Sequence, residues 1–143
     1  MATMISLTIL PGCDGIFSRP PLERDFGTGY DILFNEPSTD DVDGRLTPFI
    51  DEDGVLRVIV RFVGGCVEHR FRPDYQLTDT SASVWLIHSS NGDTCGGENI
   101  TEIAVELPPV VLDRETIFLI GPSGNEREIP RFDETTGESS PQP

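Results

Sequence analysis

Residues 55–63 read Val-Leu-Arg-Val-Ile-Val-Arg-Phe-Val, and this stretch decides the class of fold. None of the nine is Gly or Pro, and six are β-branched or aromatic, which is typical of a β-strand. Because successive side chains of a strand point to opposite faces, the stretch has one apolar face and one face with two arginines. The two sets are Leu56, Val58, Val60 and Phe62 against Arg57 and Arg61. We expect the apolar set to point into a core.

The same period of two recurs along the chain, separated by turn residues such as Asn91-Gly92-Asp93. It predicts further strands over Val67–Arg72 and Ile100–Leu107. Two more stretches, Val84–His88 and Ile117–Ile120, are apolar on both faces and are expected to be central strands. Within Val67–Arg72, His69 shares a face with Val67 and Phe71, so we expect His69 to point inward. Six or seven short strands in about ninety residues predict a small antiparallel β-sandwich of the immunoglobulin-like kind. An open barrel is the alternative.

The charge of the chain narrows the classes of function. Its 143 residues carry 25 Asp and Glu against 10 Lys and Arg, a formal net charge of −15, and all ten bases are Arg. Without lysine, chemistry that needs an ε-amine is excluded, including Schiff bases and the P-loop. An acidic chain is also a poor ligand for nucleic acid, whose affinity comes from cations placed at phosphates. No apolar run is long enough to span a bilayer.

The distribution of charge and proline predicts the domain organisation. Residues 44–132 hold the strand pattern and are expected to form the β-domain. Residues 14–43 are expected to be an acidic, proline-containing linker with one edge strand near 29–34, and residues 133–143 a disordered acidic tail. The segments on either side of residues 44–132 together contain 11 of the 25 acidic residues but only two of the ten arginines, as expected for solvated segments.

Residues 1–13 end in Leu10-Pro11-Gly12-Cys13 after a short apolar run. This segment resembles the lipobox of bacterial lipoprotein signals, which has Leu three places before the cysteine and a small residue just before it. The departures are Pro11, the shortness of the apolar run and the lack of a preceding Arg. The resemblance implies lipid on the sulfur of Cys13, and hence a chain anchored in the bacterial cell envelope and facing the periplasm or the surface.

Both histidines and two of the three cysteines form a second pattern, Cys66, His69, His88 and Cys95. Thiolate and imidazole are preferred ligands of Zn²⁺, so one alternative is a Cys2His2 zinc site. If lipid occupies Cys13, Cys66 and Cys95 remain as a pair, which would form a disulfide in an oxidising compartment. We predict the disulfide, and keep the zinc site and two separate buried thiols as alternatives.

The run Gly64–Phe71, followed by His88 and Cys95, is similar to a pattern in uncharacterised bacterial lipoprotein-like proteins, for which no activity is assigned. This resemblance implies a shared β-fold and export. No catalytic signature is present in the sequence; Ser123, for instance, lacks the spacing of a nucleophile elbow. The sequence therefore predicts a non-enzymatic binding or scaffolding module, held at a membrane by lipid, for a protein or small-molecule ligand.

Overall fold

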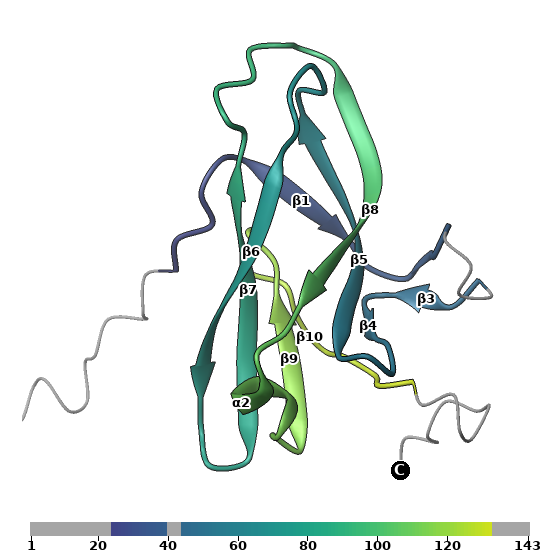
Figure 1. Ribbon diagram of the computed structural model, residues 1–143, viewed down its shortest axis with the longest axis vertical. Helices are drawn as coiled ribbons and strands as arrows, with labels where there is room; N and C mark the ends of the chain where they lie inside the picture. Colours follow the sequence, from purple (N-terminus) through teal and green to yellow (C-terminus); the bar gives the residue numbers. More distant parts are fainter. Residues whose placement is uncertain (1–23, 40–43, 133–143) are drawn as a thin grey trace, which may run out of the picture.

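A computed structural model describes residues 24–39 and 44–132 of the chain (Figure 1). This part consists of strands and one short helix, so the predicted all-β class is confirmed. In chain order the elements are β1 (Tyr30–Leu33), β2 (Glu36–Pro37), β3 (Leu46–Thr47), β4 (Phe49–Ile50), β5 (Val55–Val63), β6 (Arg70–Leu77), β7 (Ser81–Ser89), β8 (Glu98–Glu106), α2 (Pro109–Leu112), β9 (Thr116–Ile120) and β10 (Glu126–Glu128).

The first sheet is built around β5, the strand that the sequence predicts most strongly. One edge of β5 pairs with β8 along its whole length, and the other edge pairs with β1 and β4. All of these pairs are antiparallel. Strands β2 and β3 form a separate two-stranded ribbon beside this sheet (Figure 1).

The second sheet has the strand order β10-β9-β7-β6. Its β7 and β9 are parallel, whereas the other two pairs are antiparallel. The parallel pair departs from the predicted all-antiparallel arrangement. It arises because the chain leaves β7 for β8 in the first sheet and returns through α2, and parallel neighbours need such a crossover.

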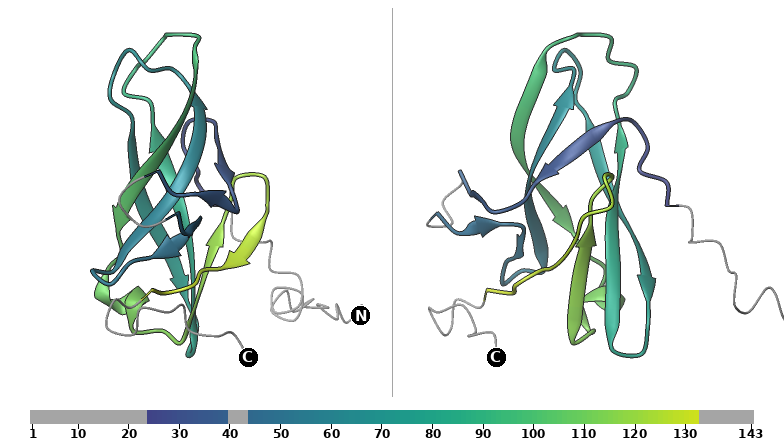
Figure 2. Two further views of the ribbon diagram at one scale, coloured as in Figure 1. Left: turned by 90° about the vertical axis from the view of Figure 1, so that its right-hand side faces the viewer. Right: turned by 180° about the vertical axis from the view of Figure 1, so that it is seen from behind.

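Buried residues of both sheets form one hydrophobic core, and two views show the sheets against each other (Figures 1 and 2). The inward face of β5 is the predicted one, because Leu56, Val58 and Val60 are fully buried and Phe62 is 9% exposed. The second sheet adds Ala82, Val84, Leu86, Ile117 and Leu119. The arrangement is sandwich-like, and the immunoglobulin-like topology stays a prediction.

The sequence predicts that the domain starts at residue 44, but the packed domain begins upstream of that residue. Strand β1 lies within the range given for an edge strand, and its Tyr30 and Ile32 belong to the core. The hydroxyl of Tyr30 donates to the carbonyl of Leu86 at 2.7 Å, which ties β1 to the second sheet. Residues 24–39 are therefore part of the domain rather than of a linker, because their apolar side chains fill its interior.

Strand β6 also differs from its prediction over Val67–Arg72. It begins at Arg70 and continues through Pro73 to Leu77, while Val67 lies in the preceding loop and is 46% exposed. Proline is tolerated in an edge strand because its missing N–H can face away from the ladder. In the sheet order β10-β9-β7-β6, β6 is at the end.

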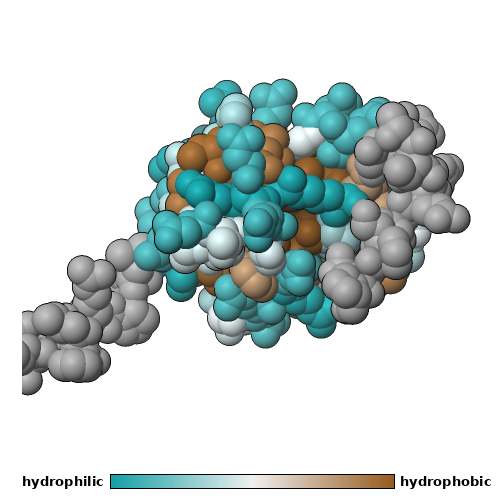
Figure 3. All heavy atoms as spheres, turned by 90° about the horizontal axis from the view of Figure 1, so that it is seen from below, coloured by the Kyte–Doolittle hydropathy of each residue, from teal (hydrophilic) through white to brown (hydrophobic). Residues whose placement is uncertain are grey.

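Several predicted segments lie outside the described residues. These are the lipobox-like segment 1–13 with Cys13, the linker residues 14–23 and 40–43, and the tail 133–143. In the described part, no helix has the length and apolar character needed to cross a bilayer. The face seen from below in Figure 3 is a mixture in which hydrophobic residues lie between hydrophilic ones.

Candidate functional site

A disulfide joins Cys66, in the loop between β5 and β6, to Cys95, in the loop between β7 and β8. Their Cα atoms are 6.0 Å apart, and the two loops meet at the upper end of the molecule in Figure 1. The predicted pairing is present, so the alternative of two separate free thiols is wrong for this structure. Both sulfurs are bonded to each other and offer no thiolate to a metal in this state.

The carboxylate of Asp93 lies at the centre of the two loops. Its Oδ2 accepts the backbone N–H groups of Gly65 at 2.6 Å, Cys66 at 3.1 Å and Val67 at 3.3 Å. Its Oδ1 accepts the N–H of Cys95 at 2.9 Å. The Cys95 N–H, the His69 imidazole and the Gly65 N–H together hold the pKa of Asp93 well below its usual value. One buried anion therefore fixes the backbone on both sides of the disulfide.

Gly64 makes this close approach possible. Its φ is +142°, in a region that L side chains rarely adopt. A Cβ built on Gly64 would lie 2.5 Å from Nε2 of His69 and 2.7 Å from Oδ2 of Asp93. Any larger residue would collide with the two polar groups that hold the loops together.

A chain of hydrogen bonds runs inward from Asp93. Its Oδ2 is 2.7 Å from Nε2 of His69, and Nδ1 of His69 is 2.7 Å from Nε2 of His88. The chain ends at the carbonyl of Thr28, 3.0 Å from Nδ1 of His88. The side chains of His69 and Asp93 are 2% and 0% exposed, so the chain is enclosed.

Three contacts in this chain need three protons, whereas two neutral imidazoles carry two. The carbonyl of Thr28 can only accept, and so can an ionised Asp93. Burial lowers the pKa of His88 and favours its neutral form. Every contact is satisfied when His88 donates from Nδ1 to Thr28, His69 donates from Nε2 to Asp93, and a third proton lies between Nδ1 of His69 and Nε2 of His88.

Aromatic rings enclose the two histidines. Phe62 stacks on His69 with ring centroids 4.3 Å apart, and Phe71 stacks on His88 at 4.4 Å with an interplanar angle of 5°. Tyr30 meets His88 edge-on at 5.6 Å. These rings exclude water from the hydrogen-bonded chain, which strengthens its polar contacts.

The predicted Cys2His2 set does not converge on one point. His88 is connected to the disulfide loops through His69, and it is Asp93 that lies beside the sulfurs. Among the described residues, Sγ of Cys66, Sγ of Cys95 and a carboxylate oxygen of Asp93 lie within 4.8 Å of one another. The sequence pattern found the two cysteines but assigned Asp93 to a turn. One indication of a role for Asp93 was present in the sequence, namely its position between His88 and Cys95.

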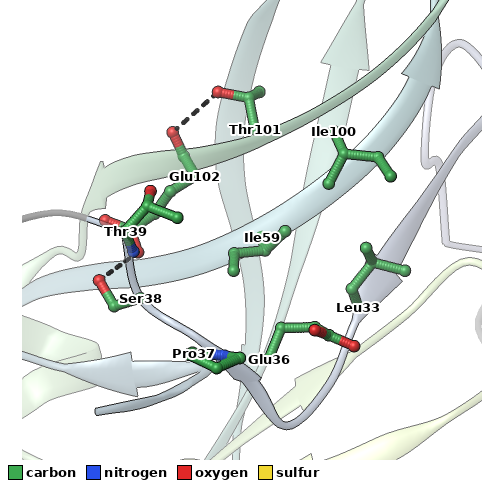
Figure 4. Close-up of a pocket in the computed structure, with 9 residues that line it drawn as sticks. All are labelled: Leu33, Glu36, Pro37, Ser38, Thr39, Ile59, Ile100, Thr101 and Glu102. Atoms are coloured by element: carbon green, nitrogen blue, oxygen red, sulfur yellow. Dashed lines mark hydrogen bonds between the residues drawn. The ribbon is translucent and has the colours of Figure 1, made fainter. Parts of the chain in front are cut away.

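A groove of about 620 Å³ opens on the outer face of the first sheet, opposite the core (Figure 4). Ile59 of β5 is 5% exposed and lies between Leu33 of β1 and Ile100 of β8, and these three make the apolar part of the groove. Residues 36–39 form a further wall. Glu102 is the cross-strand partner of Ile59 and therefore shares its face.

Two carboxylates, Glu36 and Glu102, line the same groove. Oε1 of Glu102 accepts a hydrogen bond from the hydroxyl of Ser38 and another, at 3.2 Å, from the N–H of Thr39. These bonds connect β8 to residues 36–39. Ile100 is 57% exposed although it is large and apolar. The sequence marks β8 as an alternating strand, but it gives no sign that residues 36–39 would lie across its outer face.

Comparison with known proteins adds no relative. No protein-family model matches the chain, and neither a curated protein nor a solved structure does. The disulfide-linked loops and the groove are therefore the features of this chain that bear on its function.

Proposed function

We propose that this chain is a non-enzymatic binding module of the bacterial cell envelope, held at the membrane by lipid on Cys13. The groove over Ile59 would bind a basic segment of a protein partner that also carries an aliphatic side chain. The observation that carries the proposal is the combination, in one groove, of Leu33, Ile59 and Ile100 with the exposed residue Glu36, beside a wall that Glu102 holds in place.

Charge complementarity favours a basic partner. The outer face of β8 carries Glu98, Glu102 and Glu106, since their partners Val63, Ile59 and Val55 lie on the outer face of β5. The two arginines of β5 on this face, Arg57 and Arg61, pair with Asp51 and Asp31. The whole chain has a net charge of −15. A lysine or arginine can lay its methylene stem on apolar surface while its cationic end reaches a carboxylate. Complementary potentials of this kind raise the association rate and specificity.

The burial of His69 and Asp93 supports a binding function rather than a catalytic one. His69 and Asp93 resemble a catalytic pair in residue type, but their side chains are 2% and 0% exposed. A general base must come within hydrogen-bonding reach of a substrate proton. The enclosed pair instead holds two loops in place.

The disulfide supports a location outside the reducing cytoplasm, because such bonds persist in oxidising compartments. The lipid anchor is tested by metabolic labelling with a fatty-acid analogue in a bacterial host. Label is expected on the wild-type chain and absent from Cys13→Ala. If neither chain takes up label, the anchor is wrong, and the groove can still be tested on its own.

The groove is tested with two extended peptides that alternate leucine with arginine or leucine with glutamate. Methyl resonances of Leu33, Ile59 and Ile100 are recorded during titration of the oxidised protein. The arginine peptide is expected to shift them, and the glutamate peptide is not. Ile100→Ser should weaken binding, whereas Val63→Ser changes an exposed residue on the same sheet face outside the groove and should not. Equal shifts with both peptides, or none at these methyls, would overturn the proposal.

A further inference from the structure

We propose that the chain has a second state, in which reduction of the Cys66–Cys95 disulfide creates a site for one zinc ion. Its ligands would be the thiolates of Cys66 and Cys95 and the carboxylate of Asp93. This inference goes beyond the binding function above and does not depend on the groove. It also differs from the Cys2His2 set that the sequence suggests, because His88 is not among the ligands.

The positions of the three donor groups carry the proposal. The two sulfurs and a carboxylate oxygen of Asp93 lie within 4.8 Å of one another. Two thiolates on tetrahedral zinc, each about 2.3 Å from the metal, are about 3.7 Å apart. Once the covalent bond is broken, the sulfurs need to move apart to reach that spacing. Two thiolates and a carboxylate are donors that zinc accepts, and water can take the fourth position.

The loops are suited to such a small movement. Gly64 and Gly65 precede Cys66, and Gly96 and Gly97 follow Cys95. Glycine adjusts its backbone angles at low cost, so the sulfurs can move without displacing β5 or β8. Cys66 is exposed, which leaves the disulfide open to attack by a thiol.

His69 would act as a positioning residue. Its Nε2 lies 2.7 Å from Oδ2 of Asp93, and its other nitrogen is held by His88. Metal-bound carboxylates commonly have such a hydrogen-bond partner, which fixes their orientation. The imidazole thus already holds the carboxylate in one orientation beside the sulfurs.

The chemical step balances with a dithiol as reductant. The Cys66–Cys95 bond breaks, two electrons come from the dithiol, and the dithiol becomes a cyclic disulfide while its two protons pass to the cysteine sulfurs. Zinc then binds both sulfurs and displaces these two protons into solution. Oxidation closes the disulfide and removes two of the three ligands.

The experiment uses the full chain with Cys13→Ser, so that only Cys66 and Cys95 can supply thiols. The protein is reduced with excess dithiothreitol, desalted under nitrogen and titrated with zinc in competition with a chromophoric chelator. One zinc ion per reduced chain is expected, with release of protons. The oxidised protein should bind zinc at least about 100-fold more weakly. Cobalt substitution should give a thiolate charge-transfer band, which Cys66→Ser weakens.

Two variants separate the carboxylate from a general effect of charge. Asp93→Asn is expected to weaken zinc binding by about 10–100-fold or more, whereas Asp79→Asn, an exposed residue in the turn between β6 and β7, should not. His69→Gln should fall between them. Equal zinc affinity of the oxidised and reduced proteins would overturn the site. So would wild-type affinity in reduced Asp93→Asn, whether or not the reduced chain stays folded.

Discussion

Nε2 of His69 lies 2.7 Å from Oδ2 of Asp93, in a contact that links residues 24 positions apart. His69 lies just before β6, and Asp93 lies in the loop between β7 and β8. The same carboxylate oxygen accepts three backbone N–H groups of the loop after β5. This pair therefore organises the whole upper end of the domain.

Asp93→Asn should lower the stability of the oxidised protein at pH 7. The substitution keeps the size of the side chain but removes the negative charge that faces His69 and four backbone N–H groups. Because the folded protein lowers the pKa of Asp93, its stabilising effect is present above the unfolded pKa of about 4 and is lost as the pH falls below it. Urea unfolding from pH 7 to pH 2 should show a smaller acid-induced loss in Asp93→Asn. Equal losses in Asp93→Asn and wild type would contradict this prediction.

Gly64→Ala should destabilise the domain more than the same substitution at another glycine of positive φ whose Cβ position is empty. The new Cβ would lie 2.5 Å from Nε2 of His69. Gly124 also has a positive φ, but a Cβ there meets nothing within 4 Å. We expect Gly124→Ala to cost about 1–2 kcal/mol, from the backbone alone, and Gly64→Ala to cost more. Denaturant midpoints of the two variants check the order.

Reduction of the disulfide should lower the free energy of unfolding by about 3–4 kcal/mol in the chain-entropy model, in the absence of metal. Cys66 and Cys95 are 29 residues apart, so the bond restricts a long loop of the unfolded chain. Denaturant unfolding with and without a dithiol measures the change. Thiol titration of the unlipidated, denatured chain should find one thiol before reduction and three after it, since the chain has three cysteines.

A chain that starts at Arg24 and ends at Phe132 should fold, whereas one that starts at Gly44 should not. The shorter chain lacks Tyr30 and Ile32, which are 9% and 4% exposed in the core. Loss of one large core side chain typically lowers the free energy of unfolding by about 2–5 kcal/mol. The free energy of unfolding of a whole domain is only about 5–15 kcal/mol. Circular dichroism and resonance dispersion in proton NMR distinguish the outcomes. If the chain that starts at Gly44 folds, the domain boundary predicted from the sequence is correct and this prediction is wrong.

Local pattern was enough to predict the centre of the fold. Strand β5 has the predicted bounds and inward face, and the Asn91-Gly92 turn follows β7, since both depend on neighbouring residues. The start of β6 could not be predicted in this way. Residues 67–69 alternate like a strand, but the N–H of Val67 bonds to Asp93 instead of to a strand.

The candidate sites depended still more on distant contacts. The Cys66–Cys95 pair was found by counting cysteines, which needs no geometry. The role of Asp93 requires the loop after β5 to meet the loop after β7, and the groove requires residues 36–39 to lie against Ile59. Such contacts join segments that period and turn signals treat separately, so a single sequence does not reveal them.

The carboxylate of Asp93 also bears on which cysteines become oxidised. Three cysteines allow three different pairs. Because one anion bonds the amides of both Cys66 and Cys95, loops that have already closed around it present these two thiols to each other. The cross-link between Cys66 and Cys95 would then form in preference to a pair that includes Cys13.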